Sequence, residues 1–379
     1  MSLHATAEAT RRYAAKFAER ASQDLPDQGR RAAPGHFREA QGLALSSIGI
    51  GTYLGKLDAA ADQAYSEAVQ AAVEAGINVV DTAINYRFQR SERSVAEALR
   101  RLAGQGFPRE ELLICTKGGF LAPEGAMPAD PNEYFFREYI QTGILRSADI
   151  VAGCHAIAPR FLENQLERSL RNLGVECVDV YYLHNPETQL TELSRKDFHA
   201  RVRAAFEFFE GAAQAGKMQF YGLATWDGLR QSHDSPGHVS LTELVRLARE
   251  IAGEQHRFRF AQLPFNMAMT EALTLGNQPL NGQLRTTIEA AGELGITLVG
   301  SAALMQGQLA RNLPAFVRQG FGVTTDAESA LQFARSAPGI TTALVGMCRL
   351  EHVRANARLV QVPPATVDQL AKLFSGGKA

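Results

Sequence analysis

Short apolar runs recur along most of the chain and alternate with longer segments of helical periodicity. The runs are hydrophobic at consecutive positions, which is typical of strands that are covered on both faces of a parallel sheet. Eight runs are therefore predicted as strands: residues 45–53, 77–81, 112–117, 178–184, 218–225, 258–265, 296–304 and 340–346.

The segments between these runs are predicted as helices. The clearest covers residues 159–174, where Pro159 suits the first turn and Gly174 suits the C-terminal cap. Its apolar stripe consists of Leu162, Leu166, Leu170 and Leu173. Further helices are predicted over residues 61–76, 91–102, 200–216, 241–253 and 283–295.

Eight strands alternating with helices over about 300 residues predict a single α/β domain, a (β/α)8 TIM barrel, whose typical size is about 250 residues. A doubly wound open sheet is the structural alternative. That fold normally begins with a GxGxxG turn after its first strand, and the segment GIGTYLG at 49–55 does not match it.

Two segments lie outside this alternation. Residues 1–40 are predicted as a helical, charged N-terminal extension, and residues 41–379 as one barrel. Residues 118–158 form an insertion after the third strand, far longer than the usual βα connection, and such insertions are often lids or binding loops. Its aromatic residues either pack the insertion onto the barrel or line a substrate pocket: Tyr134, Phe135, Phe136 and Tyr139.

Polar residues stand at the ends of three successive predicted strands. Asp81 ends the second strand and Tyr86 lies in the loop after it, while Lys117 ends the third strand and His184 ends the fourth. Because the carboxyl ends of barrel strands gather at one mouth, these four side chains are expected to converge there. Each alone is common in a turn or at a rim, but together they predict an active site.

The combination predicts a reaction. A tyrosine, with an ordinary pKa of about 10, needs a nearby cation to act as an acid or base at neutral pH. Lys117 can supply that charge, Asp81 can hold the lysine, and His184 can orient a carbonyl oxygen by a hydrogen bond. No nucleophile with a dedicated base and no metal-ligand spacing is evident. A proton donor beside a polarised carbonyl needs a hydride source, which indicates a nicotinamide cofactor.

From about residue 40 to residue 375 the chain resembles the aldo-keto reductase superfamily. The matching motifs are GIGTYLG, DTAINY with SE following, CTKGG, LHNPE, QLPFN and GMCRLEHVRAN. The resemblance implies a barrel oxidoreductase with a catalytic tetrad of Asp81, Tyr86, Lys117 and His184. It also implies reduction of an aldehyde or ketone to an alcohol with NADPH, with NADH as the alternative cofactor.

The resemblance also implies a set of cofactor-binding residues: Thr225, Gln262, Leu304, Gln306, Gly307, Leu309, Arg349, His352 and Asn356. Gln262 is expected to bind the nicotinamide carboxamide, and Arg349 suits the 2′-phosphate. Ala224 and Thr225 replace the Ser-Asn pair of the family, and Ser301 occupies the place of a ring-stacking tyrosine. Trp226 either compensates for that tyrosine or packs the rim.

The alternative function is an aldo-keto reductase-like barrel that binds a cofactor or a protein partner with little turnover.

Composition limits the partners. The formal net charge of −1 disfavours a broad nucleic-acid or membrane surface, so a small carbonyl compound is the expected partner. The N-terminal segment lacks the apolar middle of a signal peptide, and the four cysteines show no paired spacing, so a reduced, cytoplasmic protein is expected. A metal-dependent barrel hydrolase is disfavoured because no clustered ligands are evident.

Overall fold

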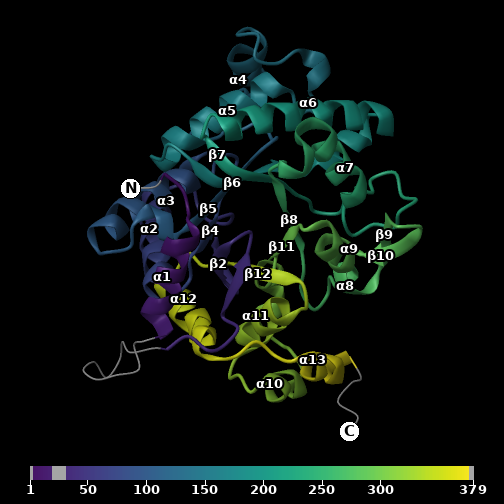
Figure 1. Ribbon diagram of the computed structural model, residues 1–379. Helices are drawn as coiled ribbons and strands as arrows, with labels where there is room; N and C mark the ends of the chain where they lie inside the picture. Colours follow the sequence, from purple (N-terminus) through teal and green to yellow (C-terminus); the bar gives the residue numbers. More distant parts are fainter. Residues whose placement is uncertain (1–2, 19–30, 375–379) are drawn as a thin grey trace.

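Eight parallel strands close into a barrel in the order β11-β12-β3-β4-β5-β6-β7-β8 (Figure 1). The computed structural model describes residues 3–18 and 31–374. The barrel strands are β3 (Ile48–Gly51), β4 (Val79–Asp81), β5 (Leu113–Gly118), β6 (Val178–His184), β7 (Met218–Ala224), β8 (Phe258–Pro264), β11 (Thr297–Ser301) and β12 (Ile340–Gly346). Every strand falls on one of the predicted apolar runs, and the predicted (β/α)8 barrel is confirmed.

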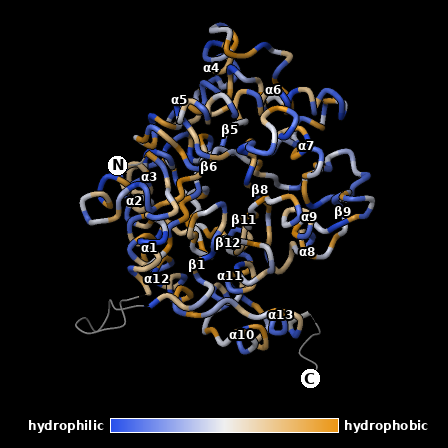
Figure 2. Tube along the Cα trace, in the orientation of Figure 1, coloured by the Kyte–Doolittle hydropathy of each residue, from blue (hydrophilic) through white to orange (hydrophobic). Residues whose placement is uncertain are grey.

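Helices form the outer layer around these strands (Figure 1). They are α1 (Ala7–Ala18), α2 (Ala59–Glu74), α3 (Arg90–Gly104), α4 (Pro131–Phe135), α5 (Pro159–Leu173), α6 (Arg195–Gln214), α7 (Leu241–Ala252), α8 (Glu271–Thr274), α9 (Thr287–Leu294), α10 (Ala315–Phe321), α11 (Asp326–Ser336), α12 (Leu350–Ala357) and α13 (Val367–Phe374). Hydrophobic and hydrophilic positions alternate along these helices (Figure 2), so one face of a helix can pack on the barrel.

Local sequence sets where the helices begin and end. In α5, Pro159 occupies the first turn, the leucine stripe is buried, and Gly174 ends the helix in a left-handed conformation with φ of 64°. The helix expected from residue 283 begins at Thr287 instead. Thr286 is the N-cap and forms a capping box with Glu289, and the preceding strand ends at this threonine. That strand, β10 (Gln283–Thr286), pairs with β9 (Gly276–Leu280) in a hairpin outside the barrel.

A second hairpin closes the barrel at the amino ends of its strands. It consists of β1 (Phe37–Ala40) and β2 (Leu43–Ser46), and the boundary expected after residue 40 falls in its turn. Leu43 and Leu45 of β2 are buried in one cluster with apolar side chains of the barrel strands, including Val79 and Leu113. The first predicted strand is therefore two strands, β2 and β3, with Ser47 between them.

The N-terminal helix α1 is part of the packed structure. Its Tyr13 is fully buried and donates a hydrogen bond of 2.5 Å from its hydroxyl to the carbonyl oxygen of Val73 in α2. Phe17 is also buried, and it belongs with Tyr13 to the main hydrophobic core. The expected helix in the first 40 residues is thus present, and it carries an apolar face as well as charged residues.

The insertion at 118–158 carries α4 and has a small apolar cluster of its own. Tyr139 is buried there, 5.1 Å from the ring of Phe161 in α5, and Phe135 stacks on Tyr139. Phe136 is 53% exposed. Figure 1 places α4 outside α5 and α6. Of the two interpretations of these aromatic residues, the structure supports packing of the insertion onto the outer helices.

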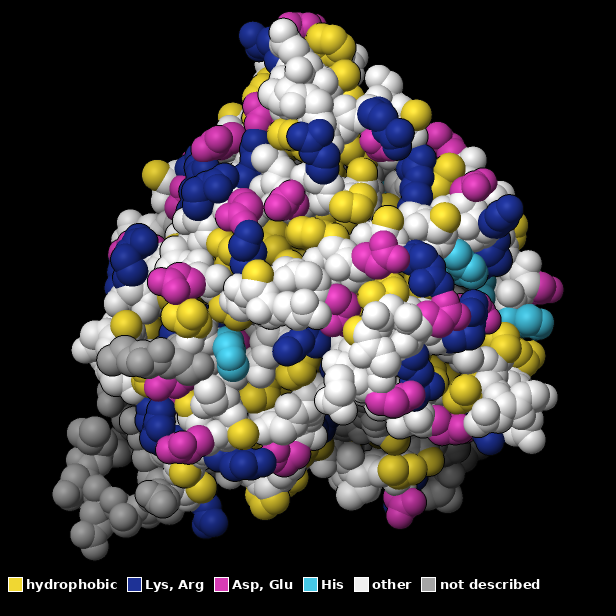
Figure 3. Space-filling view, turned by 45° about the horizontal axis from the view of Figure 1, so that its top comes forward, with side chains coloured by type: hydrophobic (Ala, Val, Ile, Leu, Met, Phe, Trp, Pro, Cys, Tyr) yellow, Lys and Arg dark blue, Asp and Glu magenta, His cyan; other side chains and the backbone are white. Residues whose placement is uncertain are grey.

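Charges of both signs are interspersed on the molecular surface, with no expanse of a single sign on the face shown in Figure 3. No helix within the described part of the chain is both long and apolar enough to cross a bilayer.

Candidate active site

The carboxyl ends of the barrel strands bring all four predicted catalytic residues to one side of the mouth. Asp81 is the last residue of β4, Lys117 lies near the end of β5, and His184 ends β6. Strand register places Asp81 beside Cys115 and Lys117 beside Tyr182. The lysine therefore stands two residues further along its strand than the aspartate.

Lys117 is the fully buried centre of the group. Its Nζ lies 2.5 Å from Oδ1 of Asp81 and donates a second hydrogen bond of 2.8 Å to the carbonyl oxygen of Thr82. Burial lowers the pKa of Lys117, but the charge and the hydrogen bond of Asp81, together with the Tyr86 side chain, outweigh burial and raise it above its usual value. Lys117 is thus a fixed positive charge at neutral pH.

Tyr86 places its ring over this charge. The Lys117 Nζ lies 4.8 Å from the centre of the Tyr86 ring, and the tyrosine is half-buried at the mouth. Burial raises the pKa of Tyr86, and Lys117 lowers it only in part. The hydroxyl is therefore protonated at neutral pH, and a cation stands beside it to stabilise the phenolate that remains once the proton has left.

His184 faces Tyr86 from β6. The two ring centres are 5.9 Å apart, and Phe120 packs edge-on against the other side of the imidazole at 5.1 Å. Burial and the charge of Lys117 hold the pKa of His184 well below its usual value, so the ring is neutral. Its Nδ1 has no hydrogen-bond partner among the described residues. A neutral imidazole has one N–H to donate and one nitrogen to accept.

Two of the predicted cofactor residues lie next to the tetrad. Gln262 in β8 is buried and donates from Nε2 to Oδ2 of Asp81 at 2.8 Å. Thr225 follows β7, and its backbone N–H bonds the carbonyl oxygen of Gln262 at 2.8 Å. The Thr225 hydroxyl is buried without a hydrogen-bond partner among the described residues. A carboxamide can accept a bond from that hydroxyl and donate one to the side-chain amide oxygen of Gln262, so these residues fit a nicotinamide.

The remaining predicted cofactor residues lie in the loops after β11 and β12. Leu304, Gln306, Gly307 and Leu309 belong to a tight turn after β11. Arg349 occupies the residue position just before α12, and its side chain is 69% exposed and makes no capping hydrogen bond. Its one described ion pair, 3.3 Å long, joins it to Glu351. His352 is also exposed on α12, whereas Asn356 is buried. Trp226 is 42% exposed at the rim.

Two features of the mouth were missed from the sequence. Residues of several mouth loops have positive φ angles although they are not glycine: Arg87, Phe88, Gln89, Asn185, Ala302, Met305 and Gln306. Such conformations cluster at functional sites, but the sequence carries no glycine or Asn-Gly signal that would reveal most of them. Aromatic rings also extend the site: Tyr53 packs 4.9 Å from Tyr86, and Phe120 packs on His184.

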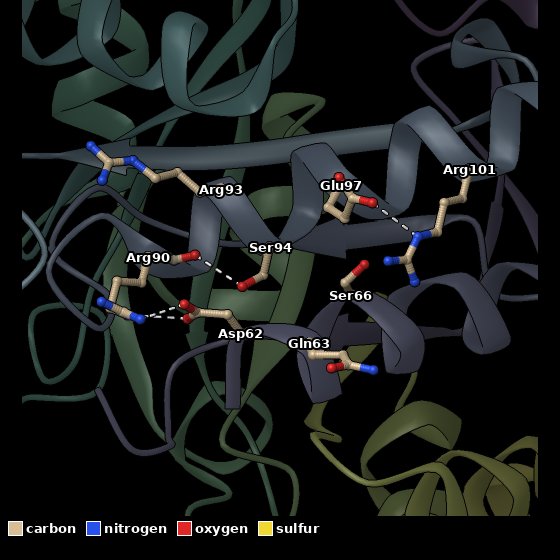
Figure 4. A pocket seen from close by; sticks show the side chains of 8 residues that line it. All are labelled: Asp62, Gln63, Ser66, Arg90, Arg93, Ser94, Glu97 and Arg101. Carbon is tan, nitrogen blue, oxygen red and sulfur yellow. Dashed lines mark hydrogen bonds and ion pairs between the residues drawn. The ribbon is translucent and has the colours of Figure 1, made fainter. Parts of the chain in front are cut away.

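A groove of about 330 Å³ lies elsewhere, between the outer helices α2 and α3 (Figure 4). Asp62 and Arg90 form a two-contact ion pair there, and Glu97 pairs with Arg101. None of the predicted catalytic or cofactor residues lines it. Among residues 3–18 and 31–374, no three His, Cys, Asp or Glu side chains are grouped as metal ligands would be.

The chain is thus a (β/α)8 barrel in which the four predicted catalytic residues lie together at the carboxyl ends of its strands. The sequence matches the model of the Aldo/keto reductase family over residues 47–375, and the chain belongs to that family. This membership confirms the resemblance seen in the sequence.

Curated relatives include the 6-dehydroglucose reductase of Novosphingobium aromaticivorans, 27% identical over 51% of this chain and 52% of the relative. The NADH-specific methylglyoxal reductase of Escherichia coli is 26% identical over 38% of this chain and 39% of the relative. The matches span about half, or less, of the length of these relatives. An aldo/keto reductase of Klebsiella pneumoniae, solved with NADP and acetate, is similar in fold, with a TM-score of 0.61, 17% identity, and coverage of 90% and 95% of the two chains.

Proposed function

We propose that this protein reduces an aldehyde or ketone to an alcohol, with Tyr86 as the proton donor. The observation that carries the proposal is the buried Lys117, held 2.5 Å from Asp81 and placed over the ring of a protonated Tyr86. Asp81, Tyr86, Lys117 and His184 come from three successive barrel strands and the loop after one of them, and they lie together at the mouth. A binding barrel without turnover has no need of this arrangement.

A nicotinamide cofactor held by Thr225 and Gln262 would supply the hydride that the carbonyl carbon receives. Tyr86 gives its hydroxyl proton to the carbonyl oxygen, and the C=O double bond becomes a C–O single bond as the alcohol forms. The phenolate left on Tyr86 is stabilised by Lys117 and takes up a proton from water. Neutral His184 donates its N–H to the carbonyl oxygen and holds it beside Tyr86.

The cofactor proposal is NADPH, with NADH as the alternative. Thr225 and Gln262 would hold the nicotinamide carboxamide. Arg349 would meet the 2′-phosphate as an exposed guanidinium, whose one ion pair among the described residues is with Glu351. The solved relative from Klebsiella pneumoniae holds NADP, whereas the Escherichia coli relative is named as NADH-specific. The choice of cofactor is therefore a property to measure.

Tyr86→Phe tests the reaction. We expect the variant to lose carbonyl reduction by about 10²–10⁴-fold, because general acid catalysis contributes that much, while the dissociation constant of NADPH stays within about twofold. The measurement is NADPH absorbance with a panel of aldehydes and ketones, and with NADH in parallel. Near-normal turnover by the Phe variant would contradict the assignment. Cofactor binding without turnover by the wild type on every carbonyl would favour the binding barrel.

A further inference from the structure

A buried chain of hydrogen bonds runs from the outer helix α6 to the backbone of His184. Arg201 in α6 donates from Nη1 to Oε1 of Gln189 at 2.7 Å. Nε2 of Gln189 lies 2.9 Å from Nδ1 of His155, and Nε2 of His155 lies 2.7 Å from the carbonyl oxygen of His184. Gln189 and His155 are both fully buried. His155 belongs to the insertion at 118–158, close to its end.

The chemistry of the two ends fixes every proton in this chain. A guanidinium only donates, so Arg201 must face the carbonyl oxygen of the Gln189 amide, and the NH₂ group of Gln189 turns to His155. Nδ1 of His155 must then accept, which leaves the imidazole proton on Nε2. A backbone carbonyl only accepts, so that proton is used at His184. If His155 were doubly protonated, its Nδ1–H would face the NH₂ group of Gln189, and neither could accept a hydrogen bond. Burial also lowers the pKa of His155 to about 4.

The acceptor of this chain lies at the point where β6 leaves the sheet. Leu183 pairs with Gly118, the last residue of β5, so β5 offers no strand partner at His184. The next residue, Asn185, has a φ of 43°, and the chain turns sharply there. The hydrogen bond from His155 therefore takes the place of the missing sheet bond at the residue that carries the catalytic imidazole.

Gly119 leaves the space for this bond. Its φ is 143°, and a methyl group on its Cα would lie 2.9 Å from Nε2 of His155 and 3.0 Å from the carbonyl oxygen of His184. The ring of Phe120 then packs edge-on against both imidazoles, at 4.9 Å from His155 and 5.1 Å from His184. Both ends of the insertion thus meet at His184.

We propose that His155 is a positioning residue: its N–H fixes the peptide plane of His184 and so aims the His184 imidazole at the reacting carbonyl. The insertion serves the active site through this anchor, while its aromatic cluster packs on α5. The catalytic consequence rests on the proposed carbonyl reduction, whereas the orientation of His184 is a property of the protein without substrate.

The test compares two substitutions of His155. His155→Leu removes the donor and keeps an apolar side chain of similar size, whereas His155→Gln keeps an amide N–H near the position of Nε2. We expect His155→Leu to lower kcat for carbonyl reduction by about 10–100-fold, because a displacement of about 1 Å in a positioning group has effects of that size. His155→Gln should recover most of kcat, and NADPH affinity should stay within about twofold in both.

A matched control separates positioning from stability. His238 is also buried and lies 3.2 Å from the amide nitrogen of Gln278, but it has no contact with His184. His238→Leu should therefore lower the melting temperature without lowering kcat. If His155→Leu does not fold, Gln189→Met takes its place, because it releases the His155 proton from its fixed nitrogen and should lower kcat by a smaller factor.

Imidazole NMR of histidine-labelled protein supplies a readout that needs no substrate. The His184 signals should shift or broaden in His155→Leu and return toward the wild-type position in His155→Gln. Unchanged His184 signals together with unchanged kcat in a folded His155→Leu variant would overturn the proposal. If the wild type reduces no carbonyl, the proposed function fails, and the His184 signals alone still decide whether His155 positions this residue.

Discussion

At the scale of single residues, the site owes its properties to which groups are buried together. Lys117 keeps its charge in a fully buried position because the Asp81 carboxylate is 2.5 Å away. His184 lies near the same charge and is driven to the neutral form by burial and by Lys117. The same local environment therefore gives one permanent cation and one neutral hydrogen-bond donor, which is the pair that a carbonyl reduction needs.

Arg349→Ala tests the choice of cofactor. We expect NADPH affinity to fall by about 10–150-fold, since hydrogen bonds to charged groups contribute about 1.5–3 kcal/mol, while NADH affinity stays nearly unchanged. Arg354→Ala is the matched control, because Arg354 is an exposed arginine of the same helix. Titrations of both cofactors with the wild type and both variants supply the dissociation constants. Equal losses for NADPH and NADH in Arg349→Ala would mean that Arg349 does not read the phosphate.

At the scale of elements, the turn after β4 aims Tyr86 at the mouth. Arg87, Phe88 and Gln89 all have left-handed φ angles, and within this turn the Arg87 side chain is buried while the Tyr86 ring packs against Lys117. The Arg87 guanidinium is buried and bonds the carbonyl oxygen of Lys56 and, at 2.6 Å, the carboxylate of Asp62. This one side chain ties the loops after β3 and β4 together.

Arg87→Met should therefore affect both stability and turnover. We expect the free energy of unfolding to fall by about 1–3 kcal/mol, because the carbonyl oxygen of Lys56 loses its hydrogen bonds from the buried guanidinium while Asp62 keeps Arg90. We expect kcat to fall as well, because the turn that carries Tyr86 becomes less rigid. Arg93→Met is the control, since Arg93 pairs with Glu124 at an exposed site and should change stability by less than about 1 kcal/mol. Urea unfolding and steady-state kinetics measure both effects. Equal, small effects in the two variants would contradict this role of Arg87.

The barrel strands and the convergence of Asp81, Tyr86, Lys117 and His184 could be predicted from the sequence, because continuous apolar runs ending in polar residues are a local signal. The hairpin of β1 and β2 could not, because the segment FREA at 37–40 has the polar composition of an exposed edge. The start of α9 was placed four residues early because helical periodicity does not register the Thr286 cap. The role of His155 was also out of reach, since its partners Gln189 and His184 are 34 and 29 residues away and meet it only in the folded chain.

At the scale of the whole molecule, buried neutral histidines make stability depend on pH. Burial lowers the pKa of His36 to about 3 and that of His155 to about 4, from an ordinary value of about 6.5. Below about pH 6.5 the unfolded chain binds protons at these positions and the folded chain does not. Stability is therefore fully present above that pH and is lost as the pH falls toward 4.

The free energy of unfolding should fall by about 1.4 kcal/mol per pH unit for each of these histidines between pH 6 and pH 5. Urea unfolding at several pH values in that window measures the slope. His155→Gln should have a slope shallower by about 1.4 kcal/mol per unit, because one titrating group is removed. A slope identical to that of the wild type would show that His155 takes up its proton equally in both states.

The hairpin that buries Leu43 and Leu45 seals the barrel at the end opposite the tetrad. Nothing can pass through the barrel, so every ligand enters and leaves by the one mouth at which Tyr86 and His184 lie. Under the proposed function, a cofactor that lies deeper in this mouth than the substrate would have to bind before it and leave after it. The β1–β2 hairpin at the amino ends of the strands would thus determine the order in which ligands bind at the carboxyl ends.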